Sequence, residues 1–249
     1  MSLARRAPLL LLLIALAISA SACGRSINKA FDPLPEYEEE LYLALDGTAT
    51  LNVNASVASL VALHGVNLPV DPRAQIDRQA VRTLYEIEGA EAIVSLSRRD
   101  GRRFVHVSID VPDLRTLERI APLSWSKYRF DRRGETFDYR QTVGAPSGRP
   151  VENVGWNGSE IVMFRMHVPS KIDFHNAPSR TVERGNIVEW EQLLSERLKG
   201  APIAIEVQMQ AQSILSNTLL LFGSTILAAA AVFAAAIWWT VRRGRDTTA

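Results

Sequence analysis

Residues 37–55 read YEEELYLALDGTATLNVNA, and this stretch decides the fold class. Polar and apolar residues alternate on both sides of Asp46-Gly47, which is typical of strands with one buried face. Because Asp-Gly tolerates the positive φ of a type I′ turn, the stretch predicts a β-hairpin. Glu38, Glu39 and Glu40 follow one another in its first strand, so their side chains face opposite sides, and we interpret them as a solvated strand edge.

The same signals recur through the middle of the chain, where alternating stretches flank further turns at Asp100-Gly101 and Arg133-Gly134. Hairpins are predicted over 92–111, 128–143 and 181–190, single strands over 161–168 and 201–209, and short helices over 56–63, 77–86 and 113–120. Hairpins alternating with short helices predict an α+β domain over 37–210, with an antiparallel sheet built from consecutive hairpins and helices on one face.

The N-terminus carries the pattern of an export signal. The charged pair Arg5-Arg6 precedes an apolar run over 9–17, and small residues stand before Cys23. This pattern predicts a signal peptide over 1–22 and a linker over 23–36. Small residues followed by cysteine resemble a bacterial lipobox, which implies diacylglycerol attached to the Cys23 sulfur. The same small residues also suit ordinary signal peptidase, which leaves Cys23 free.

A second hydrophobic segment lies near the C-terminus. Leu219 to Val241 contains no charged residue, and 23 residues at ~1.5 Å each reach ~34 Å, enough for the ~30 Å hydrocarbon core of a bilayer. We therefore predict a transmembrane helix over 214–241. The arginines that follow it predict a cytoplasmic tail over 242–249 and an extracytoplasmic body at the plasma membrane.

Composition excludes several classes of protein. The chain has 28 Lys and Arg against 27 Asp and Glu, and its middle is mildly acidic once the arginines of the two ends are set aside. A nucleic-acid binder needs a basic face, so no nucleic-acid partner is predicted. The single cysteine excludes a disulfide scaffold and a zinc site built on cysteines. No cofactor is predicted.

Catalytic signatures are sparse in this sequence. It has no Gly-x-Ser-x-Gly elbow, no phosphate loop and no His-Glu-x-x-His motif. The four histidines are not spaced three or four apart, which excludes a local helical metal pair. We predict a protein that is not an enzyme. The alternative is an envelope hydrolase whose site is assembled from distant residues such as His167, Asp173 and His175.

Arginines gather at the tips of two predicted hairpins. One interpretation is contact with anionic lipid headgroups, where each basic residue is worth about 1 kcal/mol. The other, which we favour, is that charged tips keep strand edges soluble. The six residues concerned are Arg98, Arg99, Arg102, Arg103, Arg132 and Arg133.

Three segments together carry a family resemblance: Ala20-Ser21-Ala22-Cys23, the hairpin over 41–53, and 185–190 before the last hydrophobic segment. With them the chain resembles the LppM-type envelope lipoproteins of bacteria. The resemblance implies a lipoprotein signal, an α+β ectodomain, one C-terminal spanning helix and no catalytic motif. We therefore expect a membrane-anchored extracytoplasmic protein that binds lipid or a protein partner at the cell envelope.

Overall fold

The computed structural model describes residues 34–246. Its strands are β1 (Tyr37–Leu43), β2 (Ala49–Ser56), β3 (Glu91–Arg99), β4 (Arg102–Val111), β5 (Ser126–Arg133), β6 (Thr136–Val143), β7 (Ile161–His167), β8 (Ser170–His175), β9 (Ile187–Leu193) and β10 (Ile203–Ser213). Its helices are α2 (Val57–His64), α3 (Arg78–Tyr85), η3 (Leu114–Arg119), η4 (Ala121–Leu123), α4 (Leu194–Leu198) and α5 (Ile214–Asp246). The α+β class is confirmed.

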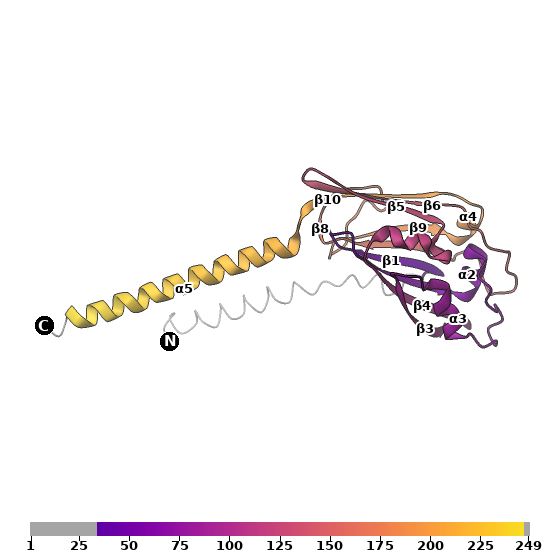
Figure 1. The fold of residues 1–249 in the computed structure, drawn as a ribbon, viewed down its shortest axis with the longest axis horizontal. Helices are drawn as coiled ribbons and strands as arrows, with labels where there is room; N and C mark the ends of the chain where they lie inside the picture. The colour runs from indigo at the N-terminus through magenta and orange to yellow at the C-terminus, as the bar shows by residue number, and fades with distance from the viewer. Residues whose placement is uncertain (1–33, 247–249) are drawn as a thin grey trace, which may run out of the picture. The chain divides into compact units, whose positions relative to one another are not determined.

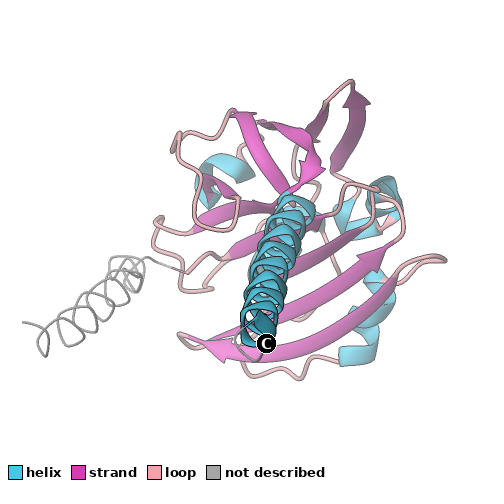
Figure 2. Cartoon of the chain, turned by 90° about the vertical axis from the view of Figure 1, so that its left-hand side faces the viewer, coloured by secondary structure: helices cyan, strands magenta, loops and turns pink. Residues whose placement is uncertain are grey.

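The strands form two sheets, which Figure 1 and Figure 2 show as two layers. One sheet has the strand order β3-β4-β2-β1-β7-β9, and the other has the order β5-β6-β10-β8. β1 and β7 run parallel, whereas the other named pairs are antiparallel. The prediction of one antiparallel sheet is therefore wrong. β7 reaches β1 only after a long crossover through the other strands, and such a crossover permits parallel pairing.

Three of the four predicted hairpins are present. The φ values of the first two turns show where a type I′ turn forms. Asp100 and Gly101 have φ values of 51° and 74°, as a type I′ turn requires. In the first hairpin only Gly47 has positive φ, at 88°, so its loop is wider than the predicted two-residue turn. The fourth hairpin is wrong, because β9 pairs with β7 and only an isolated bridge joins Glu183 to Ile187.

The hydrophobic core lies between the two sheets. Along β1 and β2 the odd-numbered residues, such as Leu41 and Leu51, turn inward and are buried. Tyr128, Tyr139 and Ile205 face them from the second sheet and are also buried. The period-two pattern of the sequence therefore marks the inner face correctly.

The buried helix α2 is held at both ends. The Ser56 side chain accepts a hydrogen bond from the Ser59 amide at its N-terminus. The loop after β6 pairs with its last turn, since the Ser147 amide donates to the Leu63 carbonyl at 3.0 Å. Gly148 touches the helix so closely that a Cβ atom there would lie 2.1 Å from the Ala62 carbonyl oxygen. This loop is thus a packing element.

The domain starts and finishes at opposite ends of β7. The Glu36 amide, just before β1, donates to the Ile161 carbonyl at the first residue of β7. Ser213, the last residue of β10, pairs with Ser170, three residues after the end of β7. Seven strand residues at ~3.3 Å each separate the two points by roughly 20 Å.

The C-terminal helix differs from the prediction. α5 runs from Ile214 to Asp246, so Arg242, Arg243 and Arg245, which were expected to follow the helix, lie within it. Arginine is a good helix former, and nothing in the sequence stops the helix before these residues. Among the helices described over 34–246, none is long and apolar enough to cross a membrane, so the predicted transmembrane helix over 214–241 is wrong.

Candidate functional site

A carboxylate is buried between the sheets. Glu39 on β1 is 2% exposed and accepts hydrogen bonds from three side chains. Tyr37 Oη donates at 2.6 Å, Trp125 Nε1 at 3.0 Å and Gln141 Nε2 at 3.4 Å. β1 is a central strand, flanked by β2 and β7, and Glu38 is buried as well, so the interpretation of Glu38 to Glu40 as a solvated edge is wrong.

Burial shifts the pKa values of Glu39 and of titratable groups near it. Burial raises the pKa of the Glu39 carboxyl, although its hydrogen bonds act in the opposite direction. The pKa of the nearby His64 imidazole falls to about 3, first because of burial and then because of the positive charge of Arg197. The Arg197 guanidinium lies 4.7 Å from the centre of the Trp125 ring and donates to backbone carbonyls of Gly144 and Ala201. These groups form one buried polar network.

The space inside this network is too small for a ligand. The cavity that Glu39, Tyr128, Gln141 and Phe164 line has a volume of about 10 Å³. A single water needs roughly that much space. Perturbed groups often mark active sites, but here no substrate has access to them, so the network specifies the packing of the two sheets.

A second polar row crosses the outward face of the six-stranded sheet. Arg165 on β7 lies 2.7 Å from Glu38 and donates to Glu189, also at 2.7 Å. Asn54 donates to Glu38 at 3.1 Å and contacts the His106 ring at 2.9 Å. Burial lowers the pKa of the Arg165 guanidinium, but the carboxylates, led by Glu38, outweigh it, and the pKa is raised. Arg165 also lies 3.7 Å from Glu40, so one positive charge faces three carboxylates and the row keeps a net negative charge.

The residues suggested for a hydrolase have separate partners. His167 Nε2 lies 2.8 Å from Glu40 Oε1, and its ring stacks on Tyr42 with centroids 4.0 Å apart. Asp173 and His175 lie on β8 in the other sheet. Asp173 accepts a hydrogen bond from the Gln210 side chain, and the His175 ring accepts one from the Ala177 amide. No contact found in the described chain joins His167 to Asp173 or His175.

Histidines and carboxylates do not form a metal site in the described residues 34–246. No group of three or more His, Cys, Asp or Glu side chains there is arranged to hold an ion. His106 and His167 lie on the same face, but three strand spacings of ~4.8 Å, or roughly 14 Å, separate β4 from β7. Cys23, the predicted lipidation site, lies outside the described residues.

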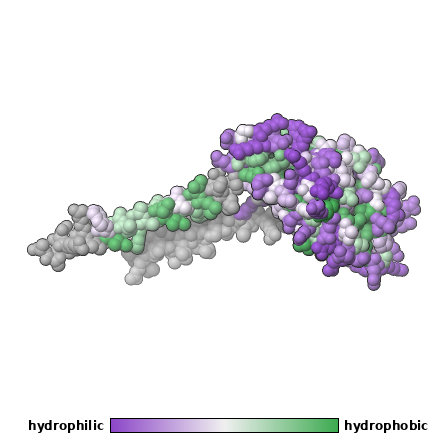
Figure 3. Space-filling model, viewed as in Figure 1, coloured by the Kyte–Doolittle hydropathy of each residue, from purple (hydrophilic) through white to green (hydrophobic). Residues whose placement is uncertain are grey.

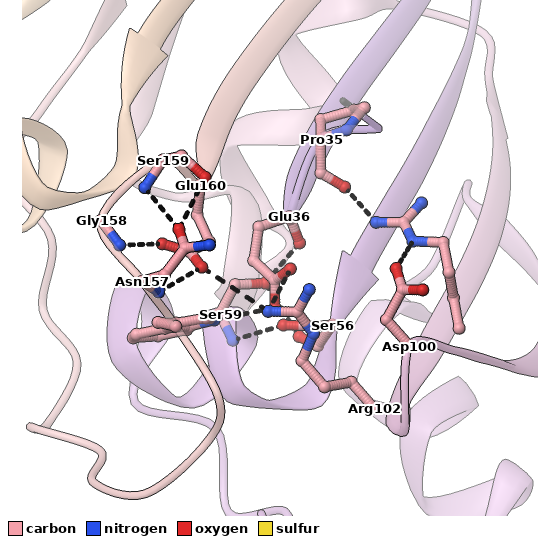
Figure 4. A network of polar contacts seen from close by, with 12 residues as sticks. Pro35, Glu36, Ser56, Ser59, Asp100, Arg102, Asn157, Gly158, Ser159 and Glu160 are labelled. Atoms are coloured by element: carbon pink, nitrogen blue, oxygen red, sulfur yellow. Dashed lines mark hydrogen bonds and ion pairs between the residues drawn. The ribbon is translucent and has the colours of Figure 1, made fainter. Parts of the chain in front are cut away.

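The first arginine cluster, Arg98, Arg99, Arg102 and Arg103, lies where the domain begins, and Figure 4 shows Arg102 beside Glu36. Arg102 lies 3.4 Å from Glu36 and 3.8 Å from Glu160, and Trp156 Nε1 donates to Glu36 at 2.9 Å. Arg99 donates to the Pro35 carbonyl at 2.7 Å. Glu36 is 2% exposed, so Arg102 neutralises a buried carboxylate and fixes the first residues of the domain.

Arg98 and Arg103 have a different environment from their neighbours. Both guanidinium groups donate to the Pro72 carbonyl, at 3.3 and 2.8 Å. They border an open pocket of about 330 Å³ that Ile76, Leu96 and Phe104 also line. A guanidinium carries five donors, so both arginines keep donors for an anion after bonding to Pro72.

The second arginine cluster lies where β10 ends. The Ala211 amide donates to the Glu135 carbonyl at 2.8 Å, which places the β5–β6 turn beside the last residues of β10. Arg133 pairs with Asp138 at 3.0 Å, and Arg132 donates to the Gly134 carbonyl at 3.1 Å. The two clusters therefore lie at opposite ends of β7, and each of the six predicted arginines has an intramolecular partner. Their contact with headgroups stays a prediction.

The described side chains of α5 form a long apolar surface, which is mostly green in Figure 3. Leu220, Leu227 and Val232 are 73%, 72% and 71% exposed. Among the α5 residues whose side chains are described, none belongs to the buried core. α5 therefore leaves apolar side chains uncovered where a soluble helix would bury them.

Comparisons with known proteins give one similarity of fold. No family model and no curated protein matches the chain. The folded domain of LppM from Mycobacterium tuberculosis, known from an NMR structure, is similar with a TM-score of 0.41 and 12% identity. The similarity covers 75% of this chain and 95% of that domain. A similarity this low assigns neither a family nor a function.

Proposed function

We propose that the chain is a non-enzymatic binding protein of the bacterial cell envelope that contacts lipid. The observation that carries the proposal is the uncovered apolar surface of α5. Contiguous exposed apolar surface marks a site that meets lipid or an apolar partner. The export pattern before Cys23 supports the same placement from the sequence.

The pocket beside Arg98 and Arg103 supports lipid contact independently. Its apolar lining suits hydrocarbon, and its two guanidinium groups suit an anionic group next to that hydrocarbon. Arg99 and Arg102 are less suited to a ligand, because they hold Pro35 and Glu36. We therefore narrow the headgroup proposal at this hairpin to Arg98 and Arg103.

The separate partners of His167, Asp173 and His175 support a binding role over a hydrolase. Hydrolysis by nucleophilic or general-base catalysis needs a base within hydrogen-bond reach of the group it activates. Glu39, the carboxylate whose pKa is raised by burial, is enclosed between the sheets.

Vesicle flotation of the full chain tests the proposal. We expect the protein to float with phosphatidylcholine vesicles, and a Leu227→Lys, Val232→Lys double variant to stay in the bottom fraction. Ile93→Lys is the matched control, because Ile93 on β3 is 72% exposed but belongs to another surface. Flotation of the double variant at the level of the unmodified chain contradicts the role of α5.

A further inference from the structure

A groove of about 570 Å³ runs beside β9, the edge strand of the six-stranded sheet. We call it the β9 groove. It lies between β9, the short helix α4 and the first residues of β10. The lining residues that matter here are Ile161, Trp190, Glu191, Leu193, Glu196 and Ile203.

The outer edge of β9 offers backbone groups for pairing. Ile187 exchanges two backbone hydrogen bonds with Glu183 on the side away from β7, at 2.8 and 3.4 Å. Peptide groups alternate between the two sides of a strand, so those of Glu191 and Leu193 face the same outer side. The Leu193 carbonyl begins the hydrogen-bonding of α4 as its N-cap, whereas no hydrogen bond to the Glu191 peptide groups is found among the described residues. An edge of this kind is a template for an added strand.

The floor of the β9 groove is apolar and fixed in position. The Trp190 indole donates to Asn176 Oδ1 at 2.9 Å, and the same oxygen accepts from the Glu206 amide. Asn176 Nδ2 also donates to the Ala204 carbonyl at 2.8 Å. Asn176, which also lines the groove, thus ties β9 to β10. Leu193, 40% exposed, adds apolar surface to the lining.

The β9 groove is negatively charged. Its only charged lining residues are Glu191 and Glu196, and both are exposed. A second copy of this chain is a poor occupant, because pairing two β9 edges brings like charges together. A basic occupant is favoured for the same reason.

We propose that the β9 groove binds an extended segment of a partner protein in which basic and apolar residues alternate. Such a segment adds a strand to β9. Its apolar side chains turn inward onto Trp190 and Ile203, and its basic side chains turn outward to Glu191. The inference rests on the proposed binding role, but this groove is separate from α5, so it is tested without lipid.

The probe is the peptide acetyl-VKVKVK-amide, titrated onto the full chain and followed by amide hydrogen exchange. We expect exchange of the outer β9 amides to slow on binding. A Val–Glu peptide and a Val–Lys peptide with proline at the third position should each bind at least tenfold more weakly, since one reverses the charge and the other lacks an amide donor. Glu191→Lys should cause the same loss, whereas Glu91→Lys, on the opposite edge strand β3, should cause none.

Several outcomes overturn the inference. Equal binding by the Val–Glu peptide, protection at β3 instead of β9, or no binding at all removes the groove as a basic-segment site. Protection of β9 that rises with protein concentration alone identifies a second copy as the occupant. Because vesicles are absent, none of these results bears on flotation through α5.

Discussion

His64 gives the most direct test of the buried network. Its ring lies against Trp125 and Tyr37, with centroids 4.4 and 5.1 Å away, and its Nε2 has no hydrogen-bond partner among the described residues. Burial and Arg197 lower the pKa of the folded-state imidazole to about 3 from its usual 6.5. His64→Phe keeps a ring in the same space and removes the group that takes up a proton.

The expected size of the effect follows from these two pKa values. Between pH 6.5 and 3 the unfolded chain binds a proton at His64 that the folded chain does not, so stability falls as pH falls. At pH 4.5 the loss is about 3 kcal/mol, because this pH lies two units below the unfolded pKa and each unit is worth ~1.4 kcal/mol. The contribution of Glu39 to the pH dependence has the opposite sign. Because its pKa is raised in the folded state, stability decreases as pH rises above the unfolded-state pKa of about 4.5.

Urea unfolding of the full chain and of His64→Phe at pH 7.5 and 4.5 measures the difference. The Glu39 contribution is common to both proteins and cancels. We expect the free energy of unfolding of the unmodified chain to fall by about 3 kcal/mol more than that of His64→Phe. An NMR titration should also show the His64 ring unprotonated at pH 4.5. Equal pH dependence of the two proteins would refute the buried, neutral imidazole.

Two further predictions concern packing and charge. Gly148→Ala should cost about 3 kcal/mol of unfolding free energy, because its Cβ would lie 2.1 Å from the Ala62 carbonyl oxygen; Gly223→Ala, with open space around it, is the control. An unchanged urea midpoint for Gly148→Ala would contradict this packing. Arg98→Glu with Arg103→Glu should weaken binding to phosphatidylglycerol-containing vesicles roughly 30-fold or more, at about 1 kcal/mol per arginine. Loss of flotation on pure phosphatidylcholine as well would instead indicate misfolding.

Much of the fold follows from local sequence signals. The alternation in β1 and β2 and the Asp100-Gly101 turn predict hairpins that the structure contains. The helix predicted over 77–86 is present as α3, with Asp77 as its N-cap. These elements are determined by residues that are close together in the sequence, so local patterns are enough to predict them.

The pairing of strands that are far apart in the sequence cannot be predicted from such local patterns. No local signal reports that β7 lies beside β1, or that Ser170–His175 forms a strand in the second sheet. The interpretation of Glu39 as a solvated residue is wrong for the same reason. A glutamate in a run of three suggests solvent, and only the arrival of Trp125 and Gln141 from the other sheet supplies its donors. The one available signal was its odd-numbered position, in phase with Tyr37 and Leu41.

The positions at which the chain enters and leaves the domain determine how it responds to tension. A force applied between residue 35 and Ser213 acts roughly along the strand direction, since the two points lie at opposite ends of β7. β1 is bonded to β2 on one side and β7 on the other, so such a pull loads both ladders in shear. Many backbone hydrogen bonds then have to break together instead of one after another. A domain attached at these two positions would therefore resist mechanical extension far better than one peeled from a sheet edge.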